Sequence, residues 1–296
     1  MTGRKAAVVV PVYQPGAGFG RVIAAIAREA PAELVVVDDG STHGVNPLLH
    51  DVNINVVTHR SNRGRAAARN TGWRRTTAPI VAFLDADIAV EPGYLDALIA
   101  PFADPQCVAV VGALAVSGSE DPYPRYLRER PAPPVGEAAP WRHFLTGLCA
   151  VRRSALEAVG GFREDVRYGE DLTLACALSR LYPRGLVHAP SAVGHMLEVD
   201  SLESVLDKMR DFGRNLRTIE SHCPDVWALS GLGRLASDRV ADRALLWMAR
   251  RRTPASLAHA VARHGPRRWT PPAVRYLLGH ALATAFHDST GASANP

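Results

Sequence analysis

Acidic residues follow two apolar segments in the amino-terminal half of this 296-residue chain. One segment ends in DDGST at 38–42, and another ends in DAD at 85–87. Clustered carboxylates raise one another's pKa unless a cation or hydrogen-bond donors lie between them. Two carboxylates one residue apart after a buried strand offer the hard oxygen ligands that Mg²⁺ or Mn²⁺ share with substrate phosphates. Asp85 and Asp87 are therefore candidate metal ligands, although turn formation or helix capping also explains such residues.

The elements that would position these residues are of two kinds. Continuous apolar runs predict buried parallel strands, and the stretches between several of them predict helices. Alternating strands and helices imply a doubly wound, mostly parallel sheet, whose ligand site lies beyond the carboxyl ends of the strands. The expected strands cover 6–12, 34–37, 54–57, 80–84 and 108–111, and the expected helices cover 21–29, 65–75 and 93–102.

The rest of the chain differs in character. Six prolines between residues 122 and 140 predict a surface excursion or lid. A short strand is expected at 186–188, and the pattern beyond residue 200 is helical. We expect helices over 172–181, 201–220, 241–251, 254–263 and 273–286, a large domain over 1–200, a helical extension over 201–290 packed on it, and a frayed tail over 291–296.

The composition suits a folded domain with an anionic partner. Hydrophobic residues make up 47% of the chain, and the formal charge of +5 suits nucleotide diphosphates, nucleic acid or an anionic membrane surface. The four cysteines form no CxxC pair, which argues against a zinc cluster or a disulfide framework and fits a reducing cytosol. We interpret the amino terminus as a first strand and not as a signal peptide. The sequence contains no run of about 18 apolar residues, so we expect no membrane span.

Six sequence blocks occur in a distinctive order within residues 6–181: VVVPVYQP, VVVDDGST, NRGRAAARNTGW, FLDADI, GLCAVRRSALEAVGGF and GEDLTLA. Together they resemble the family-2 glycosyltransferases with the GT-A fold. The resemblance implies an α/β protein with a GT-A-type doubly wound, mostly parallel sheet flanked by helices, and a helical carboxyl-terminal appendage. It also implies an inverting, metal-dependent transfer of one sugar, a hexose, from a UDP- or GDP-sugar.

The resemblance assigns the donor side of the site. Asp87 would bind the Mn²⁺ or Mg²⁺ that bridges the two phosphates, and Asp85 would contact the ribose, the metal or a metal-bound water. A diphosphate leaving group needs its developing charge neutralised, which a metal and nearby arginines supply. Asp39 would accept a hydrogen bond from the base or ribose, and Gly147 would lie close to the sugar. The remaining donor-side residues are Pro11 and Tyr13 at the nucleobase, and Arg65, Arg69 and Asn70 beside the nucleotide; an exposed basic helix is the alternative for the arginines.

The acceptor side depends on an acidic pair that follows Gly169. The resemblance makes Asp171 the general base, which removes the acceptor hydroxyl proton as that oxygen attacks the anomeric carbon opposite the departing nucleotide. A carboxylate with a modestly raised pKa can do this at neutral pH. Glu170 is the second candidate for the base, and helix capping is the alternative for both residues. His195 would be a further metal ligand, or else a packed or surface histidine.

Two departures from the family pattern concern the acceptor and the product. Thr173 and Ala177 stand where the family often carries an acidic residue and an arginine, so the usual acceptor contacts are in doubt. The QxxRW element of processive polysaccharide synthases is absent, which favours a single transfer over polymer extrusion. Two alternatives remain, a nucleotidyltransferase and a non-catalytic nucleotide-sugar-binding protein. Residues 16–20 are similar to the glycine-rich loop of nucleotidyltransferases, but they lack the lysine that follows it.

The carboxyl-terminal third is rich in arginine and tryptophan. Residues 250–252 are three arginines, and Trp247 and Trp269 lie in the same region. We expect a helical cap with a solvated basic face, and a peripheral membrane helix that meets a lipid-linked acceptor is the alternative. The expected location is the cytoplasm, with the inner face of the membrane as the alternative, and no nucleic-acid partner is expected. The sugar, the nucleotide, the acceptor and the oligomeric state stay open.

Overall fold

The computed structural model describes residues 6–45, 54–116, 121–129, 141–224, 226, 252–265 and 270–291. The chain forms two compact units. The sheet unit combines Met1–Ala115 with Ala132–Glu198, and the helical unit combines Val116–Pro131 with Val199–Pro296. Nothing in the sequence indicated that residues 116–131 would join the helices.

The sheet unit is built on eight hydrogen-bonded strands in the order β3-β2-β1-β4-β7-β6-β8-β5. Strands β3, β2, β1 and β4 are parallel to one another, as expected, whereas β7 is antiparallel to β4 and β6, and β5 is antiparallel to β8. The sheet is therefore mixed. The strands are β1 (Ala6–Val12), β2 (Glu33–Asp38), β3 (Asn55–Thr58), β4 (Ile80–Leu84), β5 (Ile88–Val90), β6 (Ala109–Val116), β7 (Leu148–Arg152) and β8 (Leu186–Met196).

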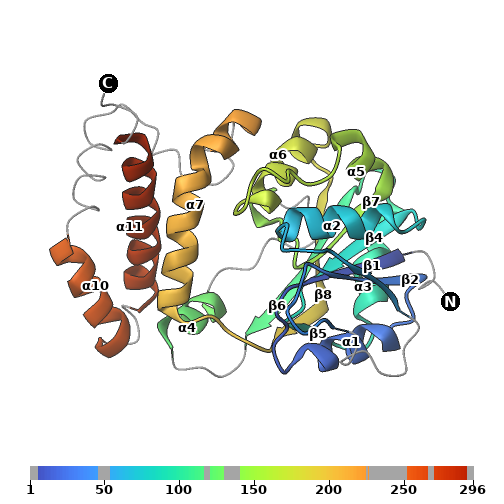
Figure 1. The fold of residues 1–296 in the computed structure, drawn as a ribbon, viewed down its shortest axis with the longest axis horizontal. Helices are drawn as coiled ribbons and strands as arrows, with labels where there is room; N and C mark the ends of the chain where they lie inside the picture. The colour runs from blue at the N-terminus through green and yellow to red at the C-terminus, as the bar shows by residue number, and fades with distance from the viewer. Residues whose placement is uncertain are drawn as a thin grey trace. The chain divides into compact units, whose positions relative to one another are not determined.

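Helices cover both faces of the parallel half of the sheet, which explains why its strands are apolar throughout. The side chains of Val8 and Val10 in β1 belong to the same core as Val22 and Ile26 of α1 (Phe19–Arg28). The opposite face of β1 meets α2 (Arg65–Arg74), and the approach there is so close that a Cβ on Gly72 would lie 2.2 Å from a methyl of Val9. Figure 1 shows both helices against the sheet.

The remaining helices of the sheet unit lie between later strands. Helix α6 begins two residues earlier than expected, so that the acidic pair at 170–171 forms its first turn. Strand β8 is longer than the expected segment 186–188, because a proline and several polar residues hide its strand pattern. The elements are α3 (Tyr94–Ile99), η3 (Ala100–Ala103), η4 (Trp141–His143), α5 (Arg153–Val159) and α6 (Glu170–Leu181).

The helical unit contains α4 (Pro122–Arg128), α7 (Leu202–His222), α10 (Arg252–His264) and α11 (Thr270–Gly291). In Figure 1, α7 and α11 run side by side, and α4 lies at one end of α7. The expectation of a surface excursion is wrong for residues 122–128. Asp121 caps a helix there by accepting a hydrogen bond from the Tyr123 N–H at 3.1 Å, and its prolines at 122 and 124 are buried. The rest of the proline-rich segment and the expected helix at 241–251 lie outside the described residues.

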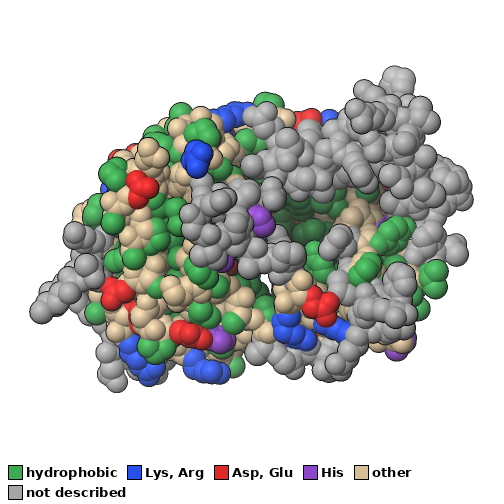
Figure 2. Space-filling view, turned by 180° about the vertical axis from the view of Figure 1, so that it is seen from behind, with side chains coloured by type: hydrophobic (Ala, Val, Ile, Leu, Met, Phe, Trp, Pro, Cys, Tyr) green, Lys and Arg blue, Asp and Glu red, His purple; other side chains and the backbone are tan. Residues whose placement is uncertain are grey.

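The described surface carries charges of both signs. On the face in Figure 2, basic side chains lie beside acidic ones. Ion pairs of the helical unit include Arg217–Glu220 and Arg214–Asp211. None of the helices in the described part of the chain is both long and apolar enough to cross a membrane.

Two of the four cysteines lie in the interior of the sheet unit. Cys107 and Cys149 are free thiols buried in the sheet unit, and burial raises the pKa of Cys107 to about 12.

Candidate active site

The first part of the candidate site is formed where β1 and β2 end. Asp39 donates its backbone N–H to the Val12 carbonyl at 2.8 Å, which joins the two strand ends. Pro11 is buried, and it lies two residues after Val9, the last residue of β1 that pairs with β4. The missing N–H of the proline therefore leaves no acceptor of β4 without its hydrogen bond. Tyr13 follows with a side chain that is 51% exposed, and an exposed ring at this position is free to meet a flat ligand.

Asp39 holds the loop that precedes α2. Its carboxylate accepts hydrogen bonds from the backbone N–H groups of Arg63 (2.9 Å) and Gly64 (2.7 Å), and pairs with His59 Nδ1 at 2.6 Å. His59 Nε2 in turn lies 2.9 Å from the Thr71 hydroxyl. Asp39 is only 3% exposed, so its first task is to fix this loop. Sequence reasoning missed His59, because no local pattern marks a histidine whose partner lies 20 residues away.

Arg69 joins the end of β4 to the start of α6. Its Nη2 donates to Asp85 Oδ1 and its Nη1 donates to Glu170 Oε1, both at 2.8 Å, and the side chain is 1% exposed. Burial alone would lower the pKa of Arg69, but the two carboxylates raise it well above its ordinary value, so the guanidinium is permanently charged. Residues that were predicted to serve the donor side and the acceptor side are therefore adjacent.

Arg65 lies one helical turn before Arg69 and contacts the same carboxylate. Its Nε is 3.4 Å from Glu170 Oε1, and its guanidinium lies over the Tyr168 ring at 5.3 Å from the centroid. Half of the Arg65 side chain is exposed, in contrast to Arg69. Arg69 is therefore not part of an exposed basic helix, and Arg65 is so only in part. The exposed part of the Arg65 side chain could contact an anion.

Asp85 and Asp87 follow β4 and are half-buried. A Cβ on Gly147 would lie 2.3 Å from Asp85 Oδ2, so the glycine is needed here to make room for the carboxylate itself. Among the residues that the structure describes, no group of three or more histidine, cysteine, aspartate or glutamate side chains could hold a metal. A DAD site with one or two carboxylate ligands still fits Mg²⁺ or Mn²⁺, which commonly complete their shells with water and substrate phosphates.

Asp171 is the second residue of α6, after Gly169 in the left-handed conformation (φ +94°). Its Oδ1 accepts a hydrogen bond from the Leu172 N–H at 2.8 Å. Burial, followed by repulsion from Glu170, raises the pKa of Asp171 from 3.8 to about 6. Because Glu170 is buried and paired with two arginines, the two adjacent carboxylates have different properties, and Asp171 is the one suited to exchange a proton near neutral pH.

Asn70 and the RR pair of the fifth block are structural. Asn70 is 2% exposed; its Oδ1 accepts from the Phe162 N–H and its Nδ2 donates to the Phe162 carbonyl, both at 2.9 Å. Arg152 donates to the carbonyls of Cys107 and Phe102 at 2.7 and 2.8 Å. Arg153 similarly donates to a backbone carbonyl, that of residue 78. These side chains hold the protein together at positions that resemble ligand-binding blocks.

His195 lies inside β8 and faces β5. Its Nε2 is 2.6 Å from Glu91 Oε1, and both side chains are more than 40% exposed. In the antiparallel register His195 is opposite Ala89, two residues beyond Asp87. His195 therefore has Glu91 as its hydrogen-bond partner, and its role as a further metal ligand stays a prediction.

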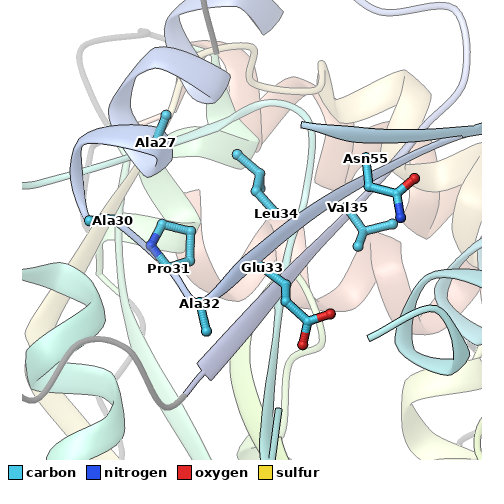
Figure 3. Close-up of a pocket in the computed structure, with 8 residues that line it drawn as sticks. All are labelled: Ala27, Ala30, Pro31, Ala32, Glu33, Leu34, Val35 and Asn55. Atoms are coloured by element: carbon cyan, nitrogen blue, oxygen red, sulfur yellow. The ribbon is translucent and has the colours of Figure 1, made fainter. Parts of the chain in front are cut away.

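A separate pocket of about 450 Å³ lies at the amino ends of β2 and β3. Figure 3 shows Pro31, Ala32 and Glu33 along the start of β2, with Asn55 of β3 nearby. None of the predicted site residues lines this pocket. Because ligand sites of parallel sheets lie at the carboxyl ends of the strands, the carboxylate-rich end is the better candidate.

Comparison with known families shows which family the chain belongs to. Residues 7–160 match the model described as "Glycosyl transferase family 2". The chain belongs to this family. Pre-mycofactocin glycosyltransferase of Mycobacterium tuberculosis is 31% identical over 264 residues, which cover 79% of the chain and 55% of that protein. Validoxylamine A glucosyltransferase of Streptomyces hygroscopicus subsp. jinggangensis is 28% identical over 278 residues, 76% of the chain and 64% of that protein. The chain therefore spans somewhat more than half the length of these curated relatives.

Solved glycosyltransferase structures confirm the expected GT-A fold. The mannosyltransferase PcManGT from Pyrobaculum calidifontis, in complex with GDP-Man and Mn²⁺, has a TM-score of 0.63 at 22% identity and covers 97% of this chain and 88% of its own. The glucosyl-3-phosphoglycerate synthase from Mycobacterium tuberculosis has a TM-score of 0.56 at 18% identity, covering 75% and 81%. The family-2 chain thus has the mixed α/β sheet flanked by helices that these structures share.

Replacing Gly147 by alanine should displace the Asp85 carboxylate, because the new Cβ would lie 2.3 Å from Oδ2. We expect the free energy of unfolding to fall by about 1–3 kcal/mol, measured by thermal unfolding, and nucleotide-sugar binding, measured by calorimetry, to weaken. Gly279→Ala in α11 is the matched control, since a Cβ there meets nothing within 4 Å. Unaltered nucleotide-sugar binding by Gly147→Ala would show that Asp85 is not needed at this position.

Proposed function

We propose that this glycosyltransferase is an inverting, metal-dependent hexosyltransferase that moves one sugar from a UDP- or GDP-sugar to an acceptor hydroxyl. The observation that carries the proposal is the Arg69 bridge, because it joins Asp85 of the DAD segment to Glu170 of the acidic pair of α6. Relatives named for pre-mycofactocin and validoxylamine A support a small, non-polymeric acceptor, such as a natural product or modified peptide. A cytoplasmic location is part of the same proposal.

On the donor side, the carboxylates of Asp85 and Asp87 would hold Mn²⁺ or Mg²⁺. The metal would neutralise the charge that develops on the departing nucleotide diphosphate. Arg65 is the exposed cation of α2 nearest to the acidic pair, and it would assist by the same electrostatic effect. Structures of PcManGT with GDP-Man and Mn²⁺ and of the glucosyl-3-phosphoglycerate synthase with UDP and Mn²⁺ support this arrangement.

On the acceptor side, Asp171 would be the general base. Its Oδ1 is occupied by the Leu172 N–H, so Oδ2 would take the acceptor proton. The acceptor oxygen would form its bond to the anomeric carbon as the bond to the diphosphate oxygen breaks, with the electron pair leaving on the nucleotide. Attack from the face opposite the leaving group inverts the anomeric centre.

The function is tested by incubating the protein with a panel of UDP- and GDP-sugars, Mn²⁺ and candidate acceptors. Release of UDP or GDP with an inverted glycosidic product is the expected result, and the anomeric configuration is read by NMR. Release of pyrophosphate would identify a nucleotidyltransferase. Donor binding without turnover across the panel would identify a nucleotide-sugar-binding protein.

Replacing Asp87 by alanine should abolish the metal dependence of donor binding, because one of two carboxylate ligands is lost. Calorimetry with a nucleotide sugar, with Mn²⁺ and then with excess EDTA, measures the effect. Asp96→Ala, in the first turn of α3, is a matched control for the loss of an aspartate. If the variant binds donor as the parent does under both conditions, Asp87 is not a metal ligand.

The rate of transfer should depend on pH through Asp171. The pKa of Asp171 is raised to about 6, and a base acts only when ionised, so turnover should fall as the pH drops through that value. Below it, the decrease should approach about tenfold per pH unit. Measuring kcat under saturating donor gives the profile. Asp171→Glu displaces the carboxyl by one methylene and should therefore shift the decrease of kcat at low pH. If this decrease is unchanged in the variant, another group is responsible for the titration.

A further inference from the structure

The helical unit contains a pocket of its own, between α7, α10 and α11. Its volume is about 220 Å³, and all of its lining residues belong to this unit. Pockets for drug-sized ligands usually span roughly 300–1,000 Å³, so this one suits a smaller molecule. The residues that matter for its chemistry are Leu206 and Arg210 of α7, His259 of α10, and Leu277, His280 and Ala281 of α11.

The lining has an apolar floor and a basic rim. Leu206, Leu277 and Ala281 are buried members of the core that joins these helices. Every ionisable side chain in the lining is a nitrogen base, one from each helix, and no carboxylate lines the pocket. Three helices thus each contribute one nitrogen base to the pocket. Arg210 carries a positive charge and each histidine can donate a ring N–H, so the lining offers a cation and several donors to an anion.

Neighbouring side chains contact two of the basic groups. Arg210 pairs through Nη1 with Asp207, one turn earlier on α7, which leaves the other guanidinium donors of its fork. The His280 ring stacks on Tyr276 at 6.2 Å between centroids and 11° between planes, which fixes its orientation. Burial, and then the proximity of Arg210 and His259, lowers the pKa of His280. A bound anion would raise the pKa of His280 and so oppose the effect of these neighbours.

We propose that this pocket binds a small oxyanion, a phosphate or phosphate ester, through Arg210, His259 and His280. A phosphate offers several acceptor oxygens to donors that arrive from different directions, and Arg is well suited to bind it. The apolar floor would contact a short organic group attached to the phosphate. The site lies in the helical unit and does not depend on the catalytic proposal.

The proposal is tested with the full chain and inorganic phosphate, by calorimetry and by NMR of histidine rings labelled with ¹³C. We expect saturable binding that shifts the rings of His259 and His280. Arg210→Gln and His259→Gln should each weaken binding by about tenfold or more. His264→Gln is the matched control, because that exposed histidine of α10 does not line the pocket.

Two phosphate sources give different results. A soluble phosphate ester such as glycerol 3-phosphate should bind more tightly than phosphate if the ligand is a free metabolite. Vesicles of phosphatidylglycerol, but not of phosphatidylcholine, should retain the parent protein and lose Arg210→Gln if the ligand is a lipid headgroup. The proposal is overturned if millimolar phosphate shifts neither ring, or if binding is equal in the parent, Arg210→Gln and His264→Gln. Circular dichroism confirms that each variant is folded.

Discussion

Asp171→Asn should lower the turnover by roughly 10²- to 10⁴-fold while donor binding is retained. The amide can still accept the Leu172 N–H through Oδ1, so the start of α6 keeps its hydrogen bond. It cannot accept the acceptor proton, and it removes the negative charge that would stabilise the protonated acceptor. Single-turnover kinetics with saturating donor measures the loss. Near-parental turnover would mean that Glu170 or a group on the acceptor is the base.

The same variant should be more stable than the parent at neutral pH. The pKa of Asp171 is raised on folding, from 3.8 to about 6, so ionised Asp171 opposes folding above that range and has no effect below it. Removing the charge should therefore raise the free energy of unfolding at pH 7 by roughly 1–3 kcal/mol. If Asp171 served only to cap the helix, its replacement would instead be neutral or destabilising. Thermal unfolding at pH 7 and at pH 4 distinguishes the two.

A control for this prediction is available at the adjacent position. Glu170 is 3% exposed and accepts from Arg69, so Glu170→Gln should destabilise the protein by leaving a buried guanidinium without one of its two carboxylate partners. The two substitutions are chemically alike and one residue apart. Opposite signs of their stability changes would establish that the two carboxylates differ in role.

The parallel half of the fold could be predicted from the sequence because its strands are buried on both faces. Residues 6–12 and 80–84 form β1 and β4 with the expected bounds. The antiparallel half could not be predicted as well. Strand β7 lies in a block that resembles a family motif but has only five residues, and β8 contains a proline and two glycine or serine positions that weaken the strand pattern. Partners distant in sequence determine these strands.

The candidate site shows the same division. The order of the acidic blocks places Asp85 and Glu170 at one site, but nothing local tells which residues of the RAAARN segment are structural. Arg69 and Asn70 are neighbours and both are buried, yet one contacts two candidate site carboxylates and the other holds the Phe162 turn. Their different roles depend on the side of α2 that each residue faces, and on partners about 100 positions later in the chain. Only the tertiary structure supplies that information.

Arg69→Lys should separate the positioning role of this residue from its charge. Lysine keeps the positive charge but cannot span Asp85 and Glu170 with a planar fork, so one of the two 2.8 Å hydrogen bonds is lost or lengthened. We expect a loss of about 1.5–3 kcal/mol in stability. A small displacement of catalytic groups should also lower kcat by up to about 10²-fold.

Arg69→Gln completes the comparison because it removes the charge as well. Leaving Glu170 buried without this partner should cost roughly 3–5 kcal/mol. Arg69 lowers the pKa of Asp171, so without it that pKa should rise further and the acid limb of the kcat profile should move to higher pH. In Arg69→Lys the limb should stay near about pH 6 because the charge is retained. A role confined to packing would destabilise both variants and leave the limb in place in both, whereas a shift confined to Arg69→Gln requires that Arg69 acts on the base through its charge.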